Sequence, residues 1–467
     1  MFGAHETMTR TTDNPFGPKI ASELYSVGII LLQLGETRKA AFQFRKALLV
    51  APNYCDAALA LGYCLHELRE FEEALAVYDR LLSASPVSTA AWNNRGTTLL
   101  EMCCYAEAAA SFSHALELNP RLYDARVALA TCYQALGLVE ESLSACNSVL
   151  AEVPEHAEAH WNKSLLLLLK GDYPQGWREY EWRWKKRNFT SPLKKFTQPS
   201  WHGDSVAGKT ILIHAEQGFG DTLQFCRYLP LVANLGAGVI FECHPPLVRL
   251  MECLAENTDV VAMGQQLPLF DMHVPLLSLP KIFGTVVETI PASVPYLAPP
   301  LDCLLSWRGL VPDESRHKVG LCWAGKSYPD PRRSCPVEQL SPLAGIDNIS
   351  WYSLQVGWED ALPFVMNDIT GNIRDFADTA ALISRLDLVI TIDTAVAHLA
   401  GALGKPTWLL LPSAPDWRWM RERNDSPWYP SMRLFRQSVT AGWEECIAEV
   451  VSALRQESSS LQGCQAL

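Results

Sequence analysis

The 467-residue sequence lacks the features that would assign it to a secreted or membrane class. Its first ten residues, MFGAHETMTR, contain neither the basic stretch nor the apolar core of a secretory signal. The longest apolar run of the N-terminal half, LLLLL at 165–169, is far too short to span a bilayer. Positive charge is also scarce, because 39 basic residues face 51 acidic ones and give a formal net charge of −12. This balance argues against a general nucleic-acid binder, although a nucleotide would need only a local site.

The fourteen cysteines form no CxxC pair and show no repeating spacing. Most stand inside apolar periodic segments, for example Cys64, Cys132, Cys146 and Cys322. Buried, reduced thiols are therefore favoured over disulfides or metal sites, and the cytoplasm is the expected location. Hydrophobic residues make up 48% and charged residues 19%, which is typical of a globular protein, and the length predicts two to four domains.

A 34-residue period organises the first third of the chain. Prolines at positions 52, 86, 120 and 154 define four units of equal length: 21–54, 55–88, 89–122 and 123–156. The eighth and twentieth positions of each unit are small, which lets paired helices approach closely: Gly28, Gly62, Gly96 and Ala130, then Ala40, Ala74, Ala108 and Ser142. This pattern resembles the tetratricopeptide repeat and predicts an α-helical solenoid.

A fifth, degenerate unit begins near Ala157 and leads into GWREYEWRWKKR at 176–187. We interpret this stretch as a capping helix that packs on the last repeat or on the next domain, because a terminal repeat needs its apolar face covered. Its basic residues also suit an anionic ligand, but a solvated helix face is the simpler interpretation. Such a solenoid offers a concave surface to a peptide or partner protein and brings no chemistry of its own.

Beyond a linker at 189–208, short β-rich runs alternate with helical segments. The expected strands are 210–215, 238–244, 271–277, 318–325, 351–356, 388–393 and 407–412, with helices at 222–236, 379–386 and 441–455. This alternation predicts parallel sheets with helices on both faces. A proline-rich stretch near 291–317 divides the strands into two groups. The expected domains are therefore a tail, repeats with their cap, and two Rossmann-like halves after the linker: 1–20, 21–188, 209–312 and 313–467.

The loops after the expected strands are candidate ligand sites, because such sheets bind ligands beyond the carboxyl ends of their strands. The loop EQGFGD combines Gly218 and Gly220 with Asp221, which is either a helix cap or a general base directed into a cleft. A second loop brings Lys326 close to Arg333 and a neighbouring arginine. These cations suit a diphosphate, and an exposed charged loop is the alternative.

The third loop is the start of DTAVAHLAGALGKP. Asp393 ends an expected buried strand, where a carboxylate needs a partner. Thr394, Ala395 and Val396 form the expected first turn of a helix, whose free N–H groups and partial positive charge suit an anion. His398 follows one turn later on the same face as Thr394, where it either faces a ligand or packs in the core.

Together, GFGD, DPRRS and DTAVAHLAGALGKP resemble motifs of the heptosyltransferase family (glycosyltransferase family 9), over roughly residues 208–436. These are GT-B enzymes that transfer a sugar from a nucleotide diphosphate. The repeats in front also make the layout similar to that of the O-linked N-acetylglucosamine transferases. The resemblance implies an α-solenoid followed by an α/β GT-B fold of two Rossmann-like halves.

The resemblance also implies roles for residues at matching positions. Asp221 corresponds to the proposed catalytic base, and Asp393 to the aspartate that contacts the donor sugar. Thr394 and Ala395 match the phosphate-binding turn, although Ala395 replaces the usual glycine, and His398 matches the histidine of the same motif.

Arg333 stands where the family often has a catalytic lysine that stabilises the leaving diphosphate. It keeps the charge of that lysine but cannot donate a proton at neutral pH. Lys326 could assist, and Gln355, which follows another expected strand, could reach the donor pocket. A nucleotide base could stack on Trp417 or Trp419, for which a structural role is the alternative.

The implied reaction is a direct displacement with inversion at the anomeric carbon. The donor would be a nucleotide-diphosphate sugar, and no metal or other cofactor is expected, since no DxD-type pair of carboxylates stands at a strand end. We expect the repeats to recruit a protein or peptide acceptor. Two alternatives remain: a heptosyltransferase-like enzyme with a glycan or lipid-linked acceptor, and a non-enzymatic repeat scaffold with an inactive GT-B domain.

Overall fold

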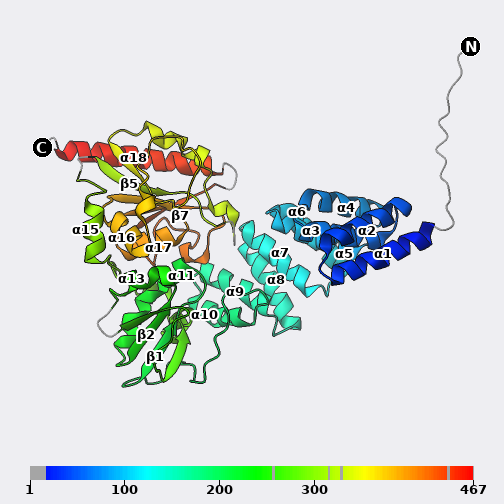
Figure 1. Cartoon of the computed structure of the whole chain (residues 1–467), viewed down its shortest axis with the longest axis horizontal. Coiled ribbons are helices and arrows are strands. Elements are labelled where there is room, and N and C mark those ends of the chain that lie inside the picture. The colour runs from blue at the N-terminus through cyan, green and yellow to red at the C-terminus, as the bar shows by residue number, and fades with distance from the viewer. Residues whose placement is uncertain (1–16, 255–257, 314–315, 327–329, 439–441, 466–467) are drawn as a thin grey trace, which may run out of the picture. The chain divides into compact units, whose positions relative to one another are not determined.

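The computed structural model describes residues 17–254, 258–313, 316–326, 330–438 and 442–465. The chain divides into two compact units, Met1–Asn162 and Lys163–Leu467. Figure 1 shows the first as helices alone and the second as two parallel sheets with helices around them. This arrangement confirms the predicted fold class.

The first unit consists of helices that pair in sequence order. They are α1 (Gly17–Gln33), α2 (Thr37–Val50), α3 (Cys55–Glu67), α4 (Phe71–Ala84), α5 (Thr89–Glu101), α6 (Tyr105–Leu118), α7 (Tyr123–Ala135), α8 (Val139–Glu152) and the beginning of α9 (Ala157–Leu169). The four expected helix pairs are confirmed. Residues 17–20 belong to α1, so this part of the expected tail is helical.

The small residue at the eighth position of each repeat makes room for a large residue of the paired helix. A Cβ added to Gly62 would lie 2.4 Å from the ring of Tyr78, and Gly96 faces Phe112 at 2.9 Å in the same way. In the fourth repeat the eighth position is Ala130, and its carbonyl accepts a 2.6 Å hydrogen bond from the hydroxyl of buried Ser142. The 34-residue period of the sequence therefore reflects the packing of each helix pair, which needs a small residue at the same place in every repeat.

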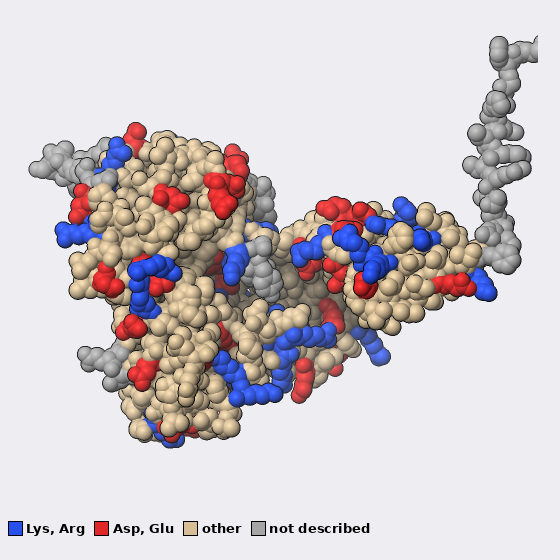
Figure 2. Space-filling model, viewed as in Figure 1, with Lys and Arg blue, Asp and Glu red and all other residues tan. Residues whose placement is uncertain are grey.

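Charged side chains of the repeats form ion pairs on the surface. Arg38 of α2 lies 3.2 Å from Glu70, the residue before α4, and Arg45 of α2 lies 2.6 Å from Glu73 of α4. Figure 2 shows basic and acidic side chains next to one another on the repeats. The face drawn there therefore carries charges of both signs.

The second unit contains two parallel sheets. The first has the strand order β3-β2-β1-β4, and the second has the order β6-β5-β7-β8-β9. The strands are β1 (Thr210–His214), β2 (Gly238–Cys243), β3 (Thr258–Ala262), β4 (Met272–Pro275), β5 (His317–Cys322), β6 (Ile349–Ser353), β7 (Leu388–Ile392), β8 (Thr407–Leu411) and β9 (Met432–Arg436). The seven expected strands are present, and β3 and β9 are additions that the sequence pattern did not predict.

Helices and 3₁₀ turns connect these strands. The α-helices are α10 (Tyr173–Tyr180), α11 (Phe219–Phe225), α12 (Leu229–Ala233), α13 (Val248–Met251), α14 (Leu279–Ile282), α15 (Leu301–Arg308), α16 (Phe376–Ser384), α17 (Ala395–Ala402) and α18 (Trp443–Gln465). The 3₁₀ turns are η1 (Glu181–Lys185), η2 (Cys226–Tyr228), η3 (Pro245–Leu247), η4 (Leu276–Ser278), η5 (Val287–Thr289), η6 (Pro331–Arg333), η7 (Val337–Gly345), η8 (Thr370–Asn372) and η9 (Trp417–Trp419). The single helix expected at 222–236 is thus two helices separated by η2, and Pro230 stands at the start of the second.

The borders of the expected domains differ from the observed ones. The division after Asn162 places the predicted capping segment, 176–187, in the second unit. The expected linker is partly buried there, because the amide of Trp201 donates to the carbonyl of His273 beside β4, and the Trp201 side chain is buried. The helix α15 falls before the expected border at 312, yet it packs on α16 through a 3.2 Å hydrogen bond from Trp307 Nε1 to Asp378.

The last helix, α18, packs on the second sheet, whereas the sequence left open a crossing to the first half. Its predicted apolar face is confirmed, since Trp443, Ile447, Val450 and Leu454 are all buried in the core that also contains β5, β7 and β8. Within the described ranges, no helix is both long enough and apolar enough to cross a bilayer.

Candidate active site

Two helices that follow strands of different sheets meet at the candidate site. The helix α11 follows β1, and α17 follows β7, so each begins at the carboxyl end of a parallel strand. Their close approach depends on Gly220, because a Cβ at this position would lie 2.8 Å from Cδ2 of His398 and 3.8 Å from Cα of Ala395. The structure thus brings the first and third loop motifs together.

Asp221 stands in the first turn of α11. Its Oδ2 accepts a 2.8 Å hydrogen bond from the backbone N–H of Gly218, which precedes the helix. Its Oδ1 lies 2.5 Å from Nη2 of Arg418, a residue of η9 in the other half. Burial raises the pKa of Asp221, while Arg418 and the Gly218 N–H partly oppose this rise. Asp221 therefore contributes to capping and also belongs to an ion pair across the two halves.

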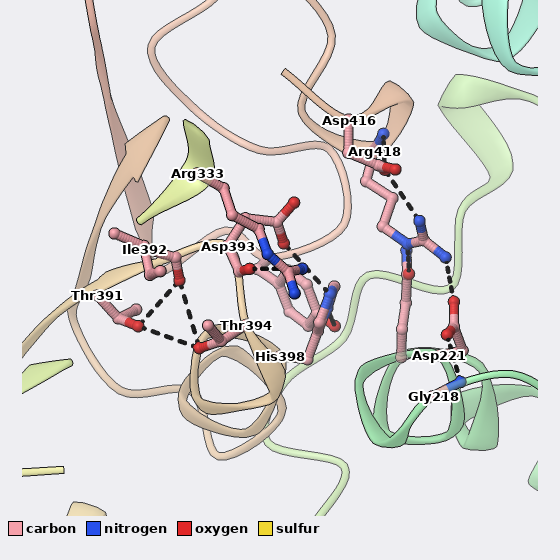
Figure 3. Close-up of polar contacts among 12 residues, drawn as sticks. Gly218, Asp221, Arg333, Thr391, Ile392, Asp393, Thr394, His398, Asp416 and Arg418 are labelled. Carbon is pink, nitrogen blue, oxygen red and sulfur yellow. Dashed lines mark hydrogen bonds and ion pairs between the residues drawn. The ribbon is translucent and has the colours of Figure 1, made fainter. Parts of the chain in front are cut away.

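Arg418 is the site residue that sequence reasoning missed. Nε of Arg418 donates to Oε1 of Gln224 at 2.5 Å, and Nη1 donates to Oδ1 of Asp416 at 2.9 Å. Figure 3 shows its guanidinium between Asp416 and Asp221. Burial lowers the pKa of Arg418, but the two carboxylates raise it by more, so the residue stays charged. The local signal was Asp-x-Arg shortly after an expected strand, which is too common to identify a site by itself.

Asp393 and His398 form the centre of the cluster. Nε2 of His398 lies 3.9 Å from Oδ1 of Asp393, and Nδ1 lies 2.9 Å from the hydroxyl of Tyr429. Burial lowers the pKa of His398 well below its usual range, and Arg418 adds to this effect, so the imidazole is neutral at neutral pH. Burial also raises the pKa of Asp393 to about 6, with a further contribution from Asp416. Burial therefore favours the protonated form of the Asp393 carboxyl more than it is favoured in an exposed aspartate.

The second loop reaches the same cluster through Arg333. Nη1 of Arg333 donates to the backbone carbonyl of Asp393 at 3.4 Å, and Nη2 donates to the carbonyl of Lys326 at 3.0 Å. The side chain of Lys326 is exposed. Arg333 thus lies beside Asp393, between the end of β7 and the start of α17. Its positive charge would be close to an anion bound at the start of that helix.

The predicted phosphate-binding turn is the N-terminus of α17. Thr394 precedes the helix, and its hydroxyl lies 3.5 Å from the carbonyl of Ile392 and 3.5 Å from the hydroxyl of Thr391. The Thr394 side chain caps no N–H of this helix. Ala395 and Val396 occupy the first turn, as expected, so their N–H groups stand at the positive end of the helix.

Gln355 lies against the backbone that follows β5, and its contact with a donor stays a prediction. Its Oε1 accepts hydrogen bonds from the backbone N–H groups of Ala324 at 2.9 Å and Trp323 at 3.3 Å. The side chain thereby fixes the backbone that follows β5. Trp417 and Trp419 are buried, and Trp419 stacks on His398 with ring centroids 5.4 Å apart. The structure therefore contradicts the suggestion that a nucleotide base stacks on an open face of either tryptophan.

The loop that leads to Asp221 is supported by the segment that the sequence suggested as a cap. Gln217 has a positive φ of 61°, a strained conformation for a residue other than glycine. Its Nε2 donates to the hydroxyl of Tyr180 at 2.9 Å. The neighbouring Glu216 accepts two hydrogen bonds from the buried guanidinium of Arg183, at 3.0 and 2.7 Å. Residues of α10 and η1, the two elements before the first sheet, thus hold the candidate catalytic loop.

No group of three or more His, Cys, Asp or Glu side chains within the described ranges is arranged as a metal site. The cysteines whose surroundings the structure describes carry free thiols, and those at 64, 132, 146 and 322 are buried, as predicted.

Comparison with known families gives matches in both parts of the chain. Residues 27–89, 61–132 and 104–175 match tetratricopeptide repeat profiles. Residues 366–419 match the profile of glycosyltransferase family 9 (heptosyltransferase), and this segment contains Asp393, Thr394, His398 and Arg418. The chain therefore resembles tetratricopeptide repeat proteins over residues 27–175 and glycosyltransferase family 9 over residues 366–419.

The chain is similar over most of its length to a protein named FlbA from Caulobacter vibrioides. The two are 26% identical over 469 residues, which cover 93% of this chain and 78% of FlbA. Solved structures that align with part of the chain include residues 41 to the end of MamA from Desulfovibrio magneticus RS-1, at 19% identity and a TM-score of 0.33, over 34% of this chain and 91% of that one. Another is YrrB, described as a tetratricopeptide repeat protein with an unusual peptide-binding site, at 22% identity and a TM-score of 0.32, over 35% of this chain and 84% of YrrB.

Proposed function

We propose that this protein is an inverting, metal-independent glycosyltransferase that moves a sugar from a nucleotide-diphosphate donor to an acceptor hydroxyl. The observation that carries the proposal is the meeting of α11 with α17. It gathers a partly buried carboxylate from one half, Asp221, with a helix N-terminus and Arg333 from the other. The family 9 match over 366–419 supports a glycosyltransferase.

In the proposed reaction, the acceptor oxygen attacks the anomeric carbon from the side opposite the diphosphate. The new C–O bond forms as the bond from that carbon to the diphosphate oxygen breaks, and the leaving group takes the electron pair. Asp221 accepts the proton of the acceptor hydroxyl. Arg333 and the N–H groups at the start of α17, at Ala395 and Val396, stabilise the charge that develops on the diphosphate.

Asp393 and His398 complete the proposed donor site. Asp393 contacts the donor sugar, with a pKa that burial raises to about 6. Neutral His398 lies beside it and is fixed by Tyr429, so it orients Asp393 and adds no second charge. Gln355 supports the backbone after β5, which makes it a positioning residue in this proposal.

We further propose that the repeats recruit a protein or peptide acceptor, as repeats of this kind bind peptides along a continuous surface. A cytoplasmic location fits the free thiols of the described cysteines. A glycan or lipid-linked acceptor is the alternative, and product analysis with each acceptor class separates the two.

The test is calorimetric titration of ADP-, GDP-, UDP- and dTDP-sugars into the wild type, Asp221→Asn and Thr394→Trp. We expect one donor to bind the wild type and Asp221→Asn, and to fail with Thr394→Trp, because the indole would fill the space at the start of α17. Turnover should fall about 10²–10⁴-fold in Asp221→Asn, the usual contribution of a general base. Turnover that persists in EDTA supports metal independence. A wild type that binds no donor would contradict the proposal and favour a non-enzymatic scaffold.

A further inference from the structure

Arg418 links the two halves at the point where the proposed base lies. Two of its hydrogen bonds cross to α11, one to Asp221 and one to Gln224. The third acceptor, Asp416, belongs to the same turn as Arg418. In the described part of the chain, these acceptors use three of the five N–H groups of the guanidinium. The side chain is 9% exposed, so its partners experience its charge with little screening by water.

This arrangement is poorly suited to a base that is always active. At this partly buried position, a carboxylate that is bound to a cation and to the N–H of Gly218 attracts a proton less well than the same carboxylate without these partners. Asp221 must therefore lose its partner before it can take the proton of an acceptor hydroxyl efficiently. A ligand that draws Arg418 away would have this effect.

We propose that Arg418 is shared between Asp221 and the donor diphosphate, so that the diphosphate releases Asp221 to act as the base. This inference rests on the proposed function. Arg418 would be a positioning residue for Asp221 before the donor binds and a diphosphate ligand afterwards.

The position of Arg418 supports this exchange. Trp419, the next residue, stacks on His398 of α17, which holds the turn of Arg418 beside the helix whose N-terminus suits the diphosphate. Asp416 keeps its bond to Arg418 within the same turn, so the guanidinium can exchange its α11 partners without losing that anchor. A diphosphate offers several charged oxygens and forms bidentate bonds with arginine, so it competes well with one carboxylate.

The exchange has a clear consequence for the order of events. Asp221 becomes a free carboxylate only in molecules that already hold a donor. The acceptor hydroxyl would then be activated after donor binding, and the kinetics should be ordered, with the donor first.

The experiment is a double-mutant cycle measured by the binding of inorganic pyrophosphate and of ADP, GDP, UDP and dTDP. The proteins are the full-length wild type, Asp221→Asn, Arg418→Gln and the double variant. Asp221→Asn removes the carboxylate that competes for Arg418. We expect affinity for the ligand to rise about tenfold, which corresponds to Arg418 being available in about one tenth of wild-type molecules and in all molecules of the variant. Arg418→Gln should weaken binding, and the gain from Asp221→Asn should disappear in that background.

Two controls keep the cycle interpretable. Asp425→Asn also removes a carboxylate paired with an arginine, Arg423, at 2.7 Å on the surface of the same segment, and should leave affinity unchanged. Arg418→Lys provides a second background that retains the charge, in case Arg418→Gln binds too weakly to measure. Thermal unfolding of each variant checks that it is folded.

The outcomes separate this inference from the proposed function. An equal gain from Asp221→Asn with and without Arg418 would overturn the inference, because the carboxylate would then act through general repulsion. Unchanged affinity in folded Asp221→Asn would overturn it as well, while nucleotide binding by the wild type would leave the proposed function intact. If none of the folded proteins binds any of these ligands, both the inference and the proposed function are overturned.

Discussion

Two arginine–glutamate pairs, one in each unit, have nearly the same shortest distance between their charged groups and very different surroundings. In the repeats, Arg45 lies 2.6 Å from Glu73, and the two side chains are 47% and 64% exposed. In the α/β unit, Arg183 lies 2.7 Å from Glu216, and both are almost fully buried. Water can replace the partner of an exposed charge, whereas a buried charge that loses its partner stays unsolvated. We therefore expect burial, and not the distance between the charges, to decide what each pair contributes to stability.

The same difference separates the two units in general. In the repeats, the described core is made of apolar side chains and small residues that fit one another. In the α/β unit, charged side chains such as Arg183, Glu216, Arg227 and Arg418 are buried close to the candidate site. Residues whose role is packing can recur at a fixed spacing in the sequence. Residues that support chemistry need particular partners, and these can lie anywhere in the sequence.

The largest expected effect comes from breaking the buried pair. Arg183→Met should lower the free energy of unfolding by about 3–5 kcal/mol, because Glu216 keeps a buried charge without its cation. Urea unfolding monitored by tryptophan fluorescence measures this loss. Adding Glu216→Gln should restore most of it, and a double variant as unstable as the single one would show that Arg183 acts through packing alone.

Filling a close helix contact in the repeats should have a smaller effect. Gly62→Ala places a Cβ 2.4 Å from the ring of Tyr78, and such overpacking costs about 1–3 kcal/mol. The measurement is again the free energy of unfolding. Gly309→Ala is the matched control, since nothing lies within 4 Å of its added Cβ. Equal stability of the two variants would refute the packing rule proposed for the eighth position.

The pH dependence of turnover tests the environment of Asp221. A base must be deprotonated, so kcat/KM should fall as the pH falls through the pKa of Asp221. Burial raises that pKa, and the fall should therefore occur at higher pH than for an exposed aspartate.

Arg418→Gln removes a cation that lowers this pKa, so the fall should move to still higher pH. The other charged or titratable groups coupled to Asp221 are Asp416, Tyr180 and His244. An unchanged profile in Arg418→Gln would count against Asp221 as the group that titrates.

The smallest effect should come from the exposed pair. Arg45→Gln is expected to change the free energy of unfolding by less than about 1 kcal/mol, because both charges remain solvated. Adding salt should not widen this difference, since salt screens exposed charges. A loss comparable to that of Arg183→Met would show that burial does not decide what the two pairs contribute.

The sequence predicted the repeats well because each contact there repeats at a fixed spacing. It predicted seven strands because they are apolar and flanked by turn residues. It missed β3, whose residues are largely half-buried, and β9, where two arginines interrupt the apolar pattern of MRLFR. Strands at the edge of a sheet have fewer buried residues and give a weaker signal.

The candidate site was predictable where a motif follows a strand. Asp221 lies in the first turn of the helix that follows β1, and Asp393 and the turn after Thr394 directly follow β7. The partner of Asp221 was not predictable, because Arg418 lies 197 residues away in the sequence. The hydrogen bond from the Ala324 N–H to Gln355 was also not predictable, since the position of Gln355 after a strand allows its side chain to face a ligand or the backbone.

The support of the Asp221 loop by Tyr180 and Arg183 limits how far the two modules of this protein are interchangeable. A different array of repeats could replace the first unit up to Asn162 without touching these contacts. A replacement that extends to 188 would remove both side chains and leave Gln217 and Glu216 without these partners. Recombination between related genes could therefore exchange the repeats freely only when the last helical turn before the sheets is inherited together with the catalytic unit.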